Sequence, residues 1–246
     1  MKALPASRRS AGFTLVEVIV SLTIVTLTIS LTLGTFMFGL RTMYKDTQRL
    51  ATNASLRSFM AQISKETLDS SEFYIFPSYQ SLGGNVNLTA DVSALTTDSY
   101  GTDVAHGDCL VLVTRTTIDT NSTVRQVRVY YRVVTVADRN NDAAIRYYET
   151  TDWGTSGNTT QTLTQILNGI NLRANPNLSG SRQLTERAKG RRIGSTTNYY
   201  PIFSSEDPTT TPTNSNVSIN VEFITGVTAL NMLSSSSFNY TISPRR

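Results

Sequence analysis

The sequence predicts an α+β protein in which one long amino-terminal α-helix packs on an antiparallel β-sheet head. Three features predict this class: an uncharged apolar run, a continuation with apolar residues every three or four positions, and a remainder of short strand-like segments between polar loops. At 246 residues and 39% hydrophobic content, the chain has room for one medium domain, or for a small domain and an appendage, but not for a large multidomain enzyme.

The apolar run covers the 23 residues from Val18 to Leu40, none of them charged. At about 1.5 Å per residue, a helix of that length crosses a hydrocarbon core roughly 30 Å thick. Its serine and threonine hydroxyls can bond back to the same helix. The run is longer than the apolar part of a secretory signal peptide, which is the alternative interpretation. We therefore predict a membrane-spanning helix, whose orientation is poorly defined because basic residues lie on both sides.

Composition excludes several classes of function. The only cysteine, Cys109, excludes an intrachain disulfide and a cysteine-based zinc site, and the only histidine, His106, excludes multi-histidine metal centres. The net charge is +4, but Lys2, Arg8 and Arg9 supply three of these charges, which leaves 4 − 3 = +1 for the rest. We therefore expect no nucleic-acid partner.

Glu17 interrupts the apolar pattern at the start of the run. An unpaired carboxylate in lipid costs a few kcal/mol, so Glu17 needs a cationic partner. The alternative is that Glu17 marks the membrane interface and that the span starts at Val18.

The segment from Gly12 to Glu17 reads GFTLVE, and it follows a short basic leader and precedes the apolar helix. It resembles the processing site of the type IV pilin and type II secretion pseudopilin superfamily. The resemblance implies cleavage between Gly12 and Phe13 by a prepilin peptidase, followed by N-methylation of Phe13. It also implies that Glu17 pairs with the amino-terminal ammonium of a neighbouring subunit during assembly.

These features divide the chain into four parts. Residues 1–12 are the expected leader peptide, and residues 13–40 are the expected transmembrane and filament-core helix. Residues 41–72 continue the helix as an amphipathic half, and residues 73–246 form the β-rich head. No proline occurs between Pro5 and Pro77, so we predict one continuous helix from about Phe13 to about Ser71.

The head is predicted to be an antiparallel sheet. Its clearest strands are expected at residues 109–115, 124–136, 144–150, 217–224 and 238–242. Val127, Val129 and Tyr131 alternate with charged or polar neighbours, as in a sheet with one buried and one wet face. We expect the amphipathic half of the helix to cover the buried face. The strand order resembles the heads of J-type pseudopilins and PilW-like pilins.

Two other clusters could carry chemistry. His106 and Cys109 are a candidate base and nucleophile, but Cys109 opens an apolar strand, where a buried inert thiol is expected. A calcium loop is indicated by the oxygen spacing of Asp138, Asn140, Asp142 and Glu149. Ala143 occupies the position where such a loop needs glycine, so a polar hairpin turn is the alternative.

The densest basic cluster lies late in the chain and precedes three aromatic residues. It consists of Arg182, Arg187, Lys189, Arg191 and Arg192, followed by Tyr199, Tyr200 and Phe203. A solvated loop is the expected structure, and contact with phosphates or an acidic partner is the alternative.

We predict a structural, non-enzymatic minor subunit of an inner-membrane-assembled filament with a periplasmic head, first as a type II secretion pseudopilin near the pseudopilus tip. A type IV minor pilin for adhesion, motility or DNA uptake is the second hypothesis, and a membrane-tethered binding or hydrolytic domain is the third. The expected partners are other pilins or pseudopilins, the prepilin peptidase and the inner-membrane assembly platform. No cofactor is expected unless the calcium loop forms.

Overall fold

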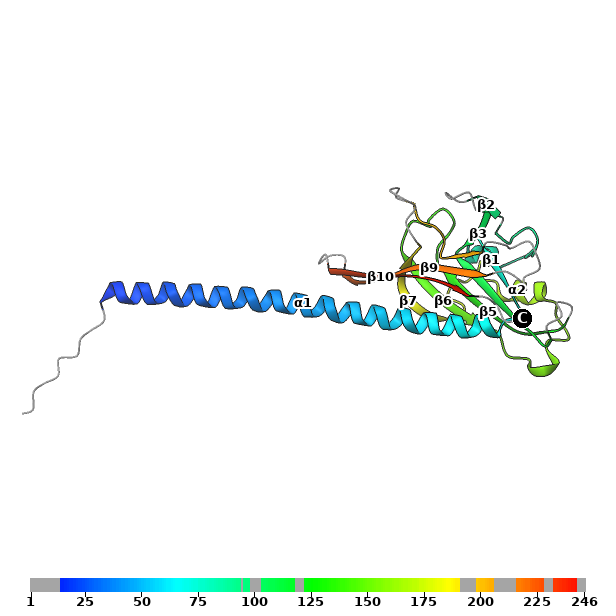
Figure 1. Ribbon diagram of the computed structural model, residues 1–246, viewed down its shortest axis with the longest axis horizontal. Helices are drawn as coiled ribbons and strands as arrows, with labels where there is room; N and C mark the ends of the chain where they lie inside the picture. Colours follow the sequence, from blue (N-terminus) through cyan, green and yellow to red (C-terminus); the bar gives the residue numbers. More distant parts are fainter. Residues whose placement is uncertain are drawn as a thin grey trace, which may run out of the picture. The chain divides into compact units, whose positions relative to one another are not determined.

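The computed structural model describes residues 14–93, 95–97, 103–117, 122–190, 198–205, 216–227 and 232–242. The chain divides into two compact units, Met1–Thr47 and Gln48–Arg246. Helix α1, Leu15–Asp69, is a single element of 55 residues (Figure 1). The prediction of one continuous helix is confirmed over the described residues, and its expected first residue, Phe13, lies outside them.

The second half of α1 belongs to the head. Its buried residues follow steps of three and four positions, which places them on one face of the helix. They are Thr52, Leu56, Phe59, Met60, Ile63 and Thr67. This face packs on the sheet, so the predicted α+β architecture is confirmed.

The described residues form a ten-stranded sheet in which every pairing is antiparallel. The strands are β1 (Glu72–Phe76), β2 (Leu95–Thr97), β3 (Asp103–Gly107), β4 (Cys109–Arg115), β5 (Val124–Arg132), β6 (Ala143–Glu149), β7 (Arg182–Lys189), β8 (Phe203–Ser205), β9 (Val217–Val227) and β10 (Met232–Ile242). Their order is β1-β4-β5-β6-β7-β9-β8-β3-β2, and β10 pairs with β9. Short 3₁₀ turns occur at Tyr79–Ser81 and Gly154–Ser156.

Both faces of the central strands are buried, which corrects the prediction of one wet face. The face that packs on α1 carries Leu110, Leu112 and Tyr130. The opposite face carries Val127 and Val129, and it packs on helix α2. The expectation that the long helix covers the valine face was therefore wrong, because strand alternation distinguishes two faces without saying which neighbour covers each.

Helix α2, Leu163–Ile170, is the element that covers the valine face. Thr162 caps it, since its hydroxyl accepts from the Gln165 backbone N–H while the Gln165 side chain accepts from the Thr162 N–H. This capping box satisfies two backbone donors at the start of a short helix. The apolar residues of α2 recur at helical spacing and are all buried: Leu163, Ile166, Leu167 and Ile170.

A buried ion pair links Asp108, which directly precedes β4, to Arg132, the last residue of β5. Asp108 and Arg132 are both fully buried, with Arg132 Nε 3.0 Å from Asp108 Oδ1. Arg139 binds the other carboxylate oxygen at 2.9 Å, and the Ile202 backbone N–H donates to Oδ1 at 3.3 Å. The remaining Arg132 donors reach backbone carbonyls of residues 139, 141 and 188. Because these partners come from separate loops and strands, the pair fixes their mutual placement.

The residue before this pair must be glycine. A Cβ atom on Gly107 would lie 2.1 Å from the carbonyl oxygen of Phe76, which is backbone and cannot move aside easily. Asp108 N also donates to the Pro77 carbonyl at 3.2 Å. The absence of a side chain at Gly107 therefore lets the end of β3 approach the end of β1, and this approach delivers Asp108 into the interior.

Polar contacts supplement the apolar packing of α1 on the sheet. The Tyr130 hydroxyl donates to Glu66 Oε2 at 2.6 Å, and Arg182 Nη2 donates to Gln62 Oε1 at 2.8 Å. The guanidinium of Arg182 also stacks over the Tyr147 ring, 5.2 Å from its centroid. These contacts fix the rotation of the second half of α1 about its axis.

Asp108→Asn should destabilise the head by about 3–5 kcal/mol, since it leaves the Arg132 charge buried without its counter-ion. The measurement is urea unfolding of the full-length protein in detergent, followed by near-ultraviolet circular dichroism. Asp152→Asn is the matched control, because Asp152 pairs with Arg125 at the surface. An Asp108→Asn midpoint equal to that of the control would contradict the assigned role of the buried pair.

Candidate functional site

The amino-terminal end of α1 is closed by a capping box. Thr14 precedes the first helical residue, and its hydroxyl accepts from the Glu17 backbone N–H at 3.3 Å. In return, Glu17 Oε2 accepts from both the Thr14 backbone N–H and the Thr14 hydroxyl, each at 3.0 Å. A threonine followed three positions later by glutamate is the sequence signature of this cap. Sequence reasoning assigned Glu17 and missed Thr14, although the signature was present.

The cap engages one carboxylate oxygen of Glu17 without neutralising its charge. Both contacts use Oε2, and no residue in the described part of the chain donates to Oε1. The described residues also place no cation against this carboxylate. Gly12 and Phe13, the expected cleavage and methylation positions, lie outside the described residues. Within the described residues, the Glu17 carboxylate is therefore hydrogen-bonded but not paired with a cation.

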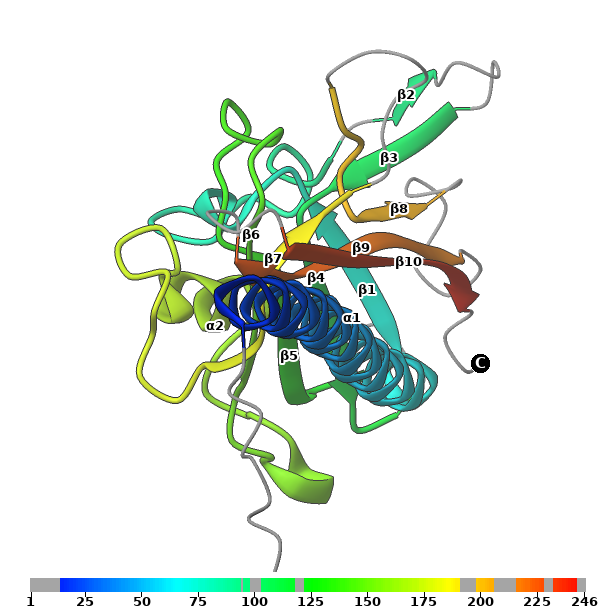
Figure 2. The ribbon, with the colours of Figure 1, turned by 90° about the vertical axis from the view of Figure 1, so that its left-hand side faces the viewer.

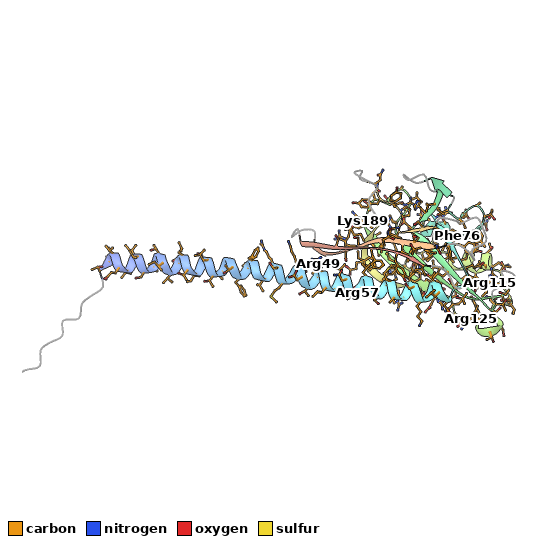
Figure 3. All side chains as sticks on the ribbon, viewed as in Figure 1. Arg49, Arg57, Phe76, Arg115, Arg125 and Lys189 are labelled. Atoms are coloured by element: carbon orange, nitrogen blue, oxygen red, sulfur yellow. The ribbon has the colours of Figure 1, made fainter. Side chains whose placement is uncertain are left out.

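The first half of α1 exposes an apolar surface. Every described side chain from Thr14 to Thr47 is exposed, including Leu15 at 77% and Phe38 at 74%. Figure 3 shows these side chains projecting from all sides of the helix. In length and composition, α1 is the one described helix that can cross a membrane. An apolar surface of this extent requires a cover of lipid or of neighbouring helices.

The hydroxyl groups within this half are satisfied by the helix itself. Ser21 Oγ donates to the Glu17 carbonyl at 2.7 Å, and Thr28 Oγ1 donates to the Ile24 carbonyl at 2.8 Å. The same bond to a carbonyl three or four residues earlier is made by Thr23, Thr26, Ser30, Thr32 and Thr35. Polar hydroxyls on an otherwise apolar helix are thus compatible with a hydrocarbon environment.

The four calcium candidates do not gather around a common point. Asp138 accepts from the Thr135 hydroxyl, and Asn140 accepts from the Tyr199 backbone N–H. Asp142 pairs with Arg187 immediately before β6.

Glu149 is at the far end of β6 and accepts from the Tyr147 hydroxyl. Seven strand residues at about 3.3 Å each separate it from Asp142 by about 23 Å. No group of three or more acidic, histidine or cysteine residues that could hold a metal occurs among the described residues.

Cys109 has the properties of a structural thiol. It is fully buried at the start of β4, packed in the same cluster as Val111 and Val129. Burial raises the pKa of the thiol well above its usual value, and the negative charge of Asp108 adds to this effect. His106 lies on β3, with its ring 5.3 Å from that of Tyr200. A thiol held protonated in an apolar core is a poor nucleophile.

The basic segment is a strand, which corrects the prediction of a solvated loop. Arg182 to Lys189 form β7, and Arg187 is paired with Asp142. Lys189 Nζ lies 5.0 Å from the centroid of the Tyr199 ring. Phe203 is fully buried and cannot stack on a nucleic-acid base. Arg191 and Arg192 lie outside the described residues.

The described residues form a β-rich head and one helix that is long and apolar enough to cross a membrane. Residues 7–33 match the prokaryotic N-terminal methylation motif. This motif supports a subunit of the type IV pilin-like or pseudopilin kind. The motif implies processing by a prepilin peptidase and assembly with other pilins. No curated protein and no solved structure matches the chain.

Cys109 should react with Ellman's reagent about a hundredfold more slowly in the folded protein than in urea, because reaction requires local opening of the core. The measurement is the rate of thionitrobenzoate release from full-length protein in detergent. Thr151→Cys, which adds a thiol at an exposed position, should release one equivalent promptly under native conditions. Rapid native release from the unsubstituted protein would contradict the assignment of Cys109 as structural.

Proposed function

We propose that the chain is a minor pseudopilin of a type II secretion system, held in the inner membrane with its head in the periplasm and then incorporated at or near the tip of a short pseudopilus. The observation that carries this proposal is the exposed apolar first half of α1, which begins within a methylation motif at a carboxylate that no described residue neutralises. A stable soluble monomer would bury such a surface, whereas a filament subunit presents it to lipid first and to neighbouring helices later.

The geometry of Glu17 supports the assembly chemistry. Cleavage between Gly12 and Phe13 would create an ammonium group at Phe13. Glu17 Oε2 is already engaged by Thr14, while Oε1 receives no donor from the described residues. In the proposed filament, Oε1 accepts the methylated ammonium of a neighbouring subunit. Pairing of opposite charges away from water is strong and directional, so it fixes the axial position of one helix against the next.

The size of the head favours sparse incorporation. Helices that pack side by side lie about 8–10 Å apart, whereas each subunit carries a compact head unit, Gln48–Arg246, with ten described strands. Repetition of so large a head on every subunit would crowd the filament surface. A place at or near the tip leaves one side of the head without such neighbours, which supports the minor role.

The variants Glu17→Gln and Thr14→Ala test separately the negative charge of Glu17 and the capping box that it forms with Thr14. The glutamine keeps an oxygen for the Thr14 donors but removes the charge, so incorporation into filaments should fall at least tenfold. The alanine keeps the charge but removes the cap, at about 1 kcal/mol, so incorporation should fall no more than about fivefold. The measurement is the fraction of the chain in sheared filament preparations relative to membranes.

Ser21→Ala is the control for this pair, since the Ser21 hydroxyl donates to the Glu17 carbonyl of its own helix. It should incorporate normally, and all three variants should keep the near-ultraviolet circular dichroism of the head. Normal incorporation of Glu17→Gln would contradict the electrostatic account of assembly.

Cells that lack this chain should retain secreted enzymes in the periplasm and still display surface pili. The physical reason is that a tip subunit of the pseudopilus starts its polymerisation and serves no separate pilus. The measurement compares extracellular enzyme activity with the number of pili seen by electron microscopy. The reverse pattern, with normal secretion and lost pili, would contradict the secretion assignment and identify a type IV minor pilin.

A further inference from the structure

Two basic residues directly follow the apolar run of α1. Arg41 comes immediately after Leu40, and Lys45 comes about one helical turn later. Residues four positions apart lie on the same side of a helix. Figure 2 views α1 nearly along its axis, so its successive turns overlap in that view. Both basic side chains are exposed, and neither forms an ion pair with a described residue.

The distance of these residues from the end of the apolar run matches the headgroup layer of a bilayer. This layer adds about 5–8 Å on each side of a hydrocarbon core roughly 30 Å thick. At about 1.5 Å per residue, Arg41 lies about 1.5 Å beyond Leu40 along α1, and Lys45 lies about 8 Å beyond it. When the run from Val18 to Leu40 spans the core, both side chains therefore lie in the headgroup layer on the side of the head.

An aromatic residue at the same depth supports this placement. Tyr44 lies between Arg41 and Lys45 in the sequence and is 43% exposed. Tyrosine is enriched at membrane–water interfaces, because its ring is apolar and its hydroxyl is polar. Arginine and lysine also suit this layer, since their apolar stems can lie along lipid while their charged ends reach the headgroups. The three side chains together have the character of an interfacial segment.

The charge of this segment is complementary to that of anionic phospholipids. From Val18 to Lys45 the chain carries two positive charges and no negative charge. Asp46 follows, but adjacent residues of a helix do not face the same side. A lipid phosphate accepts strong hydrogen bonds from guanidinium and ammonium groups. Each such cation near an anionic surface adds to the attraction, whereas a zwitterionic headgroup carries a cation of its own.

We propose that Arg41 and Lys45 form a binding site for the headgroups of anionic phospholipids, in the leaflet on the head side of the membrane. The two cations bind the phosphates, and Tyr44 lies at the level of the headgroups. This inference rests on the proposed function, because it requires the first half of α1 to be inserted in a bilayer.

The proposed processing step makes this site the basic flank of the membrane span. Lys2, Arg8 and Arg9 belong to the leader that cleavage would remove, and residues 13–40 contain no basic side chain. The processed chain therefore has basic residues only on the head side of the span. In that chain, binding of anionic headgroups by Arg41 and Lys45 limits how far the helix slides along its axis through the bilayer.

The test places a tryptophan reporter beside the site in the full-length protein. Phe38 precedes Arg41 by three positions on the same side of α1 and is 74% exposed. The variant Phe38→Trp keeps an aromatic side chain within the apolar run, where phospholipids brominated in an acyl chain quench its fluorescence on contact. The protein without this substitution has Trp153 as its only tryptophan and gives the background to subtract.

The reporter protein is reconstituted in phosphatidylcholine vesicles that contain an equal fraction of brominated phosphatidylglycerol or of brominated phosphatidylcholine. The ratio of the two quenching curves gives the preference for the anionic lipid beside the reporter. The leader residues precede the span and act on the opposite leaflet, so the uncleaved chain is suitable.

The test variant combines Arg41→Gln with Lys45→Gln in the reporter protein. Glutamine keeps the polarity and the helix propensity of these positions but removes their charge. The matched control combines Arg57→Gln with Lys65→Gln, which removes two exposed cations from the part of α1 that belongs to the head. Both variants lose the same net charge, so a difference between them reports the position of the cations.

We expect the reporter protein to prefer phosphatidylglycerol by about threefold or more at low salt. The preference should disappear in the test variant and persist in the control. Equal quenching by the two brominated lipids, or an unchanged preference in the test variant, would overturn the proposal while still showing that the helix is inserted. Failure of both brominated lipids to quench the reporter would contradict insertion itself, and with it the proposed function.

Discussion

A carboxylate at the start of an apolar helix imposes two separate requirements, hydrogen-bond donors and a counter-ion. Thr14 supplies donors to one of the two carboxylate oxygens, since its backbone and hydroxyl groups both donate to Glu17 Oε2. The requirement for charge neutralisation is not met by any described residue. Because an unpaired charge near lipid costs a few kcal/mol, this difference supplies a driving force for association with a cation from outside the chain.

The head, in contrast, contains a fully buried carboxylate, Asp108, and both of its oxygens have partners. Asp108 receives two arginines and a backbone N–H, and Arg132 fills its remaining donors with carbonyl oxygens. The central strands are covered by α1 on one face and α2 on the other. The second half of α1 is thereby fixed to a rigid scaffold.

Local features of the sequence predicted the elements that depend on local physics. The absence of proline and the apolar spacing predicted α1 to within two residues at its carboxyl end, and the bounds predicted for β4 agree with those observed. The carboxylate at Glu17 was identified because a charge in an apolar run is conspicuous. Its partner Thr14 was equally local, and the capping-box spacing could have revealed it.

The features that sequence reasoning missed depend on distant contacts. Alternation in β5 separated two faces correctly but assigned α1 to the wrong one, since nothing in the strand indicates that α2 covers the valines. Arg132 was expected on a wet face because its partner Asp108 is 24 residues away. The basic segment was predicted as a loop because its strand character comes from pairing with β6 and β9. Burial of charge and pairing of polar strands are properties of the assembled sheet.

The account depends most on the creation of a new amino terminus beside Glu17. The direct measurement is the intact mass of the protein purified from cells that contain the assembly machinery. We predict a chain that starts at Phe13, lacks the first twelve residues and carries one additional methyl group. A chain that starts at Met1, or one cleaved after residue 25, would contradict the account, because no ammonium group would then be available at the position where Glu17 requires it.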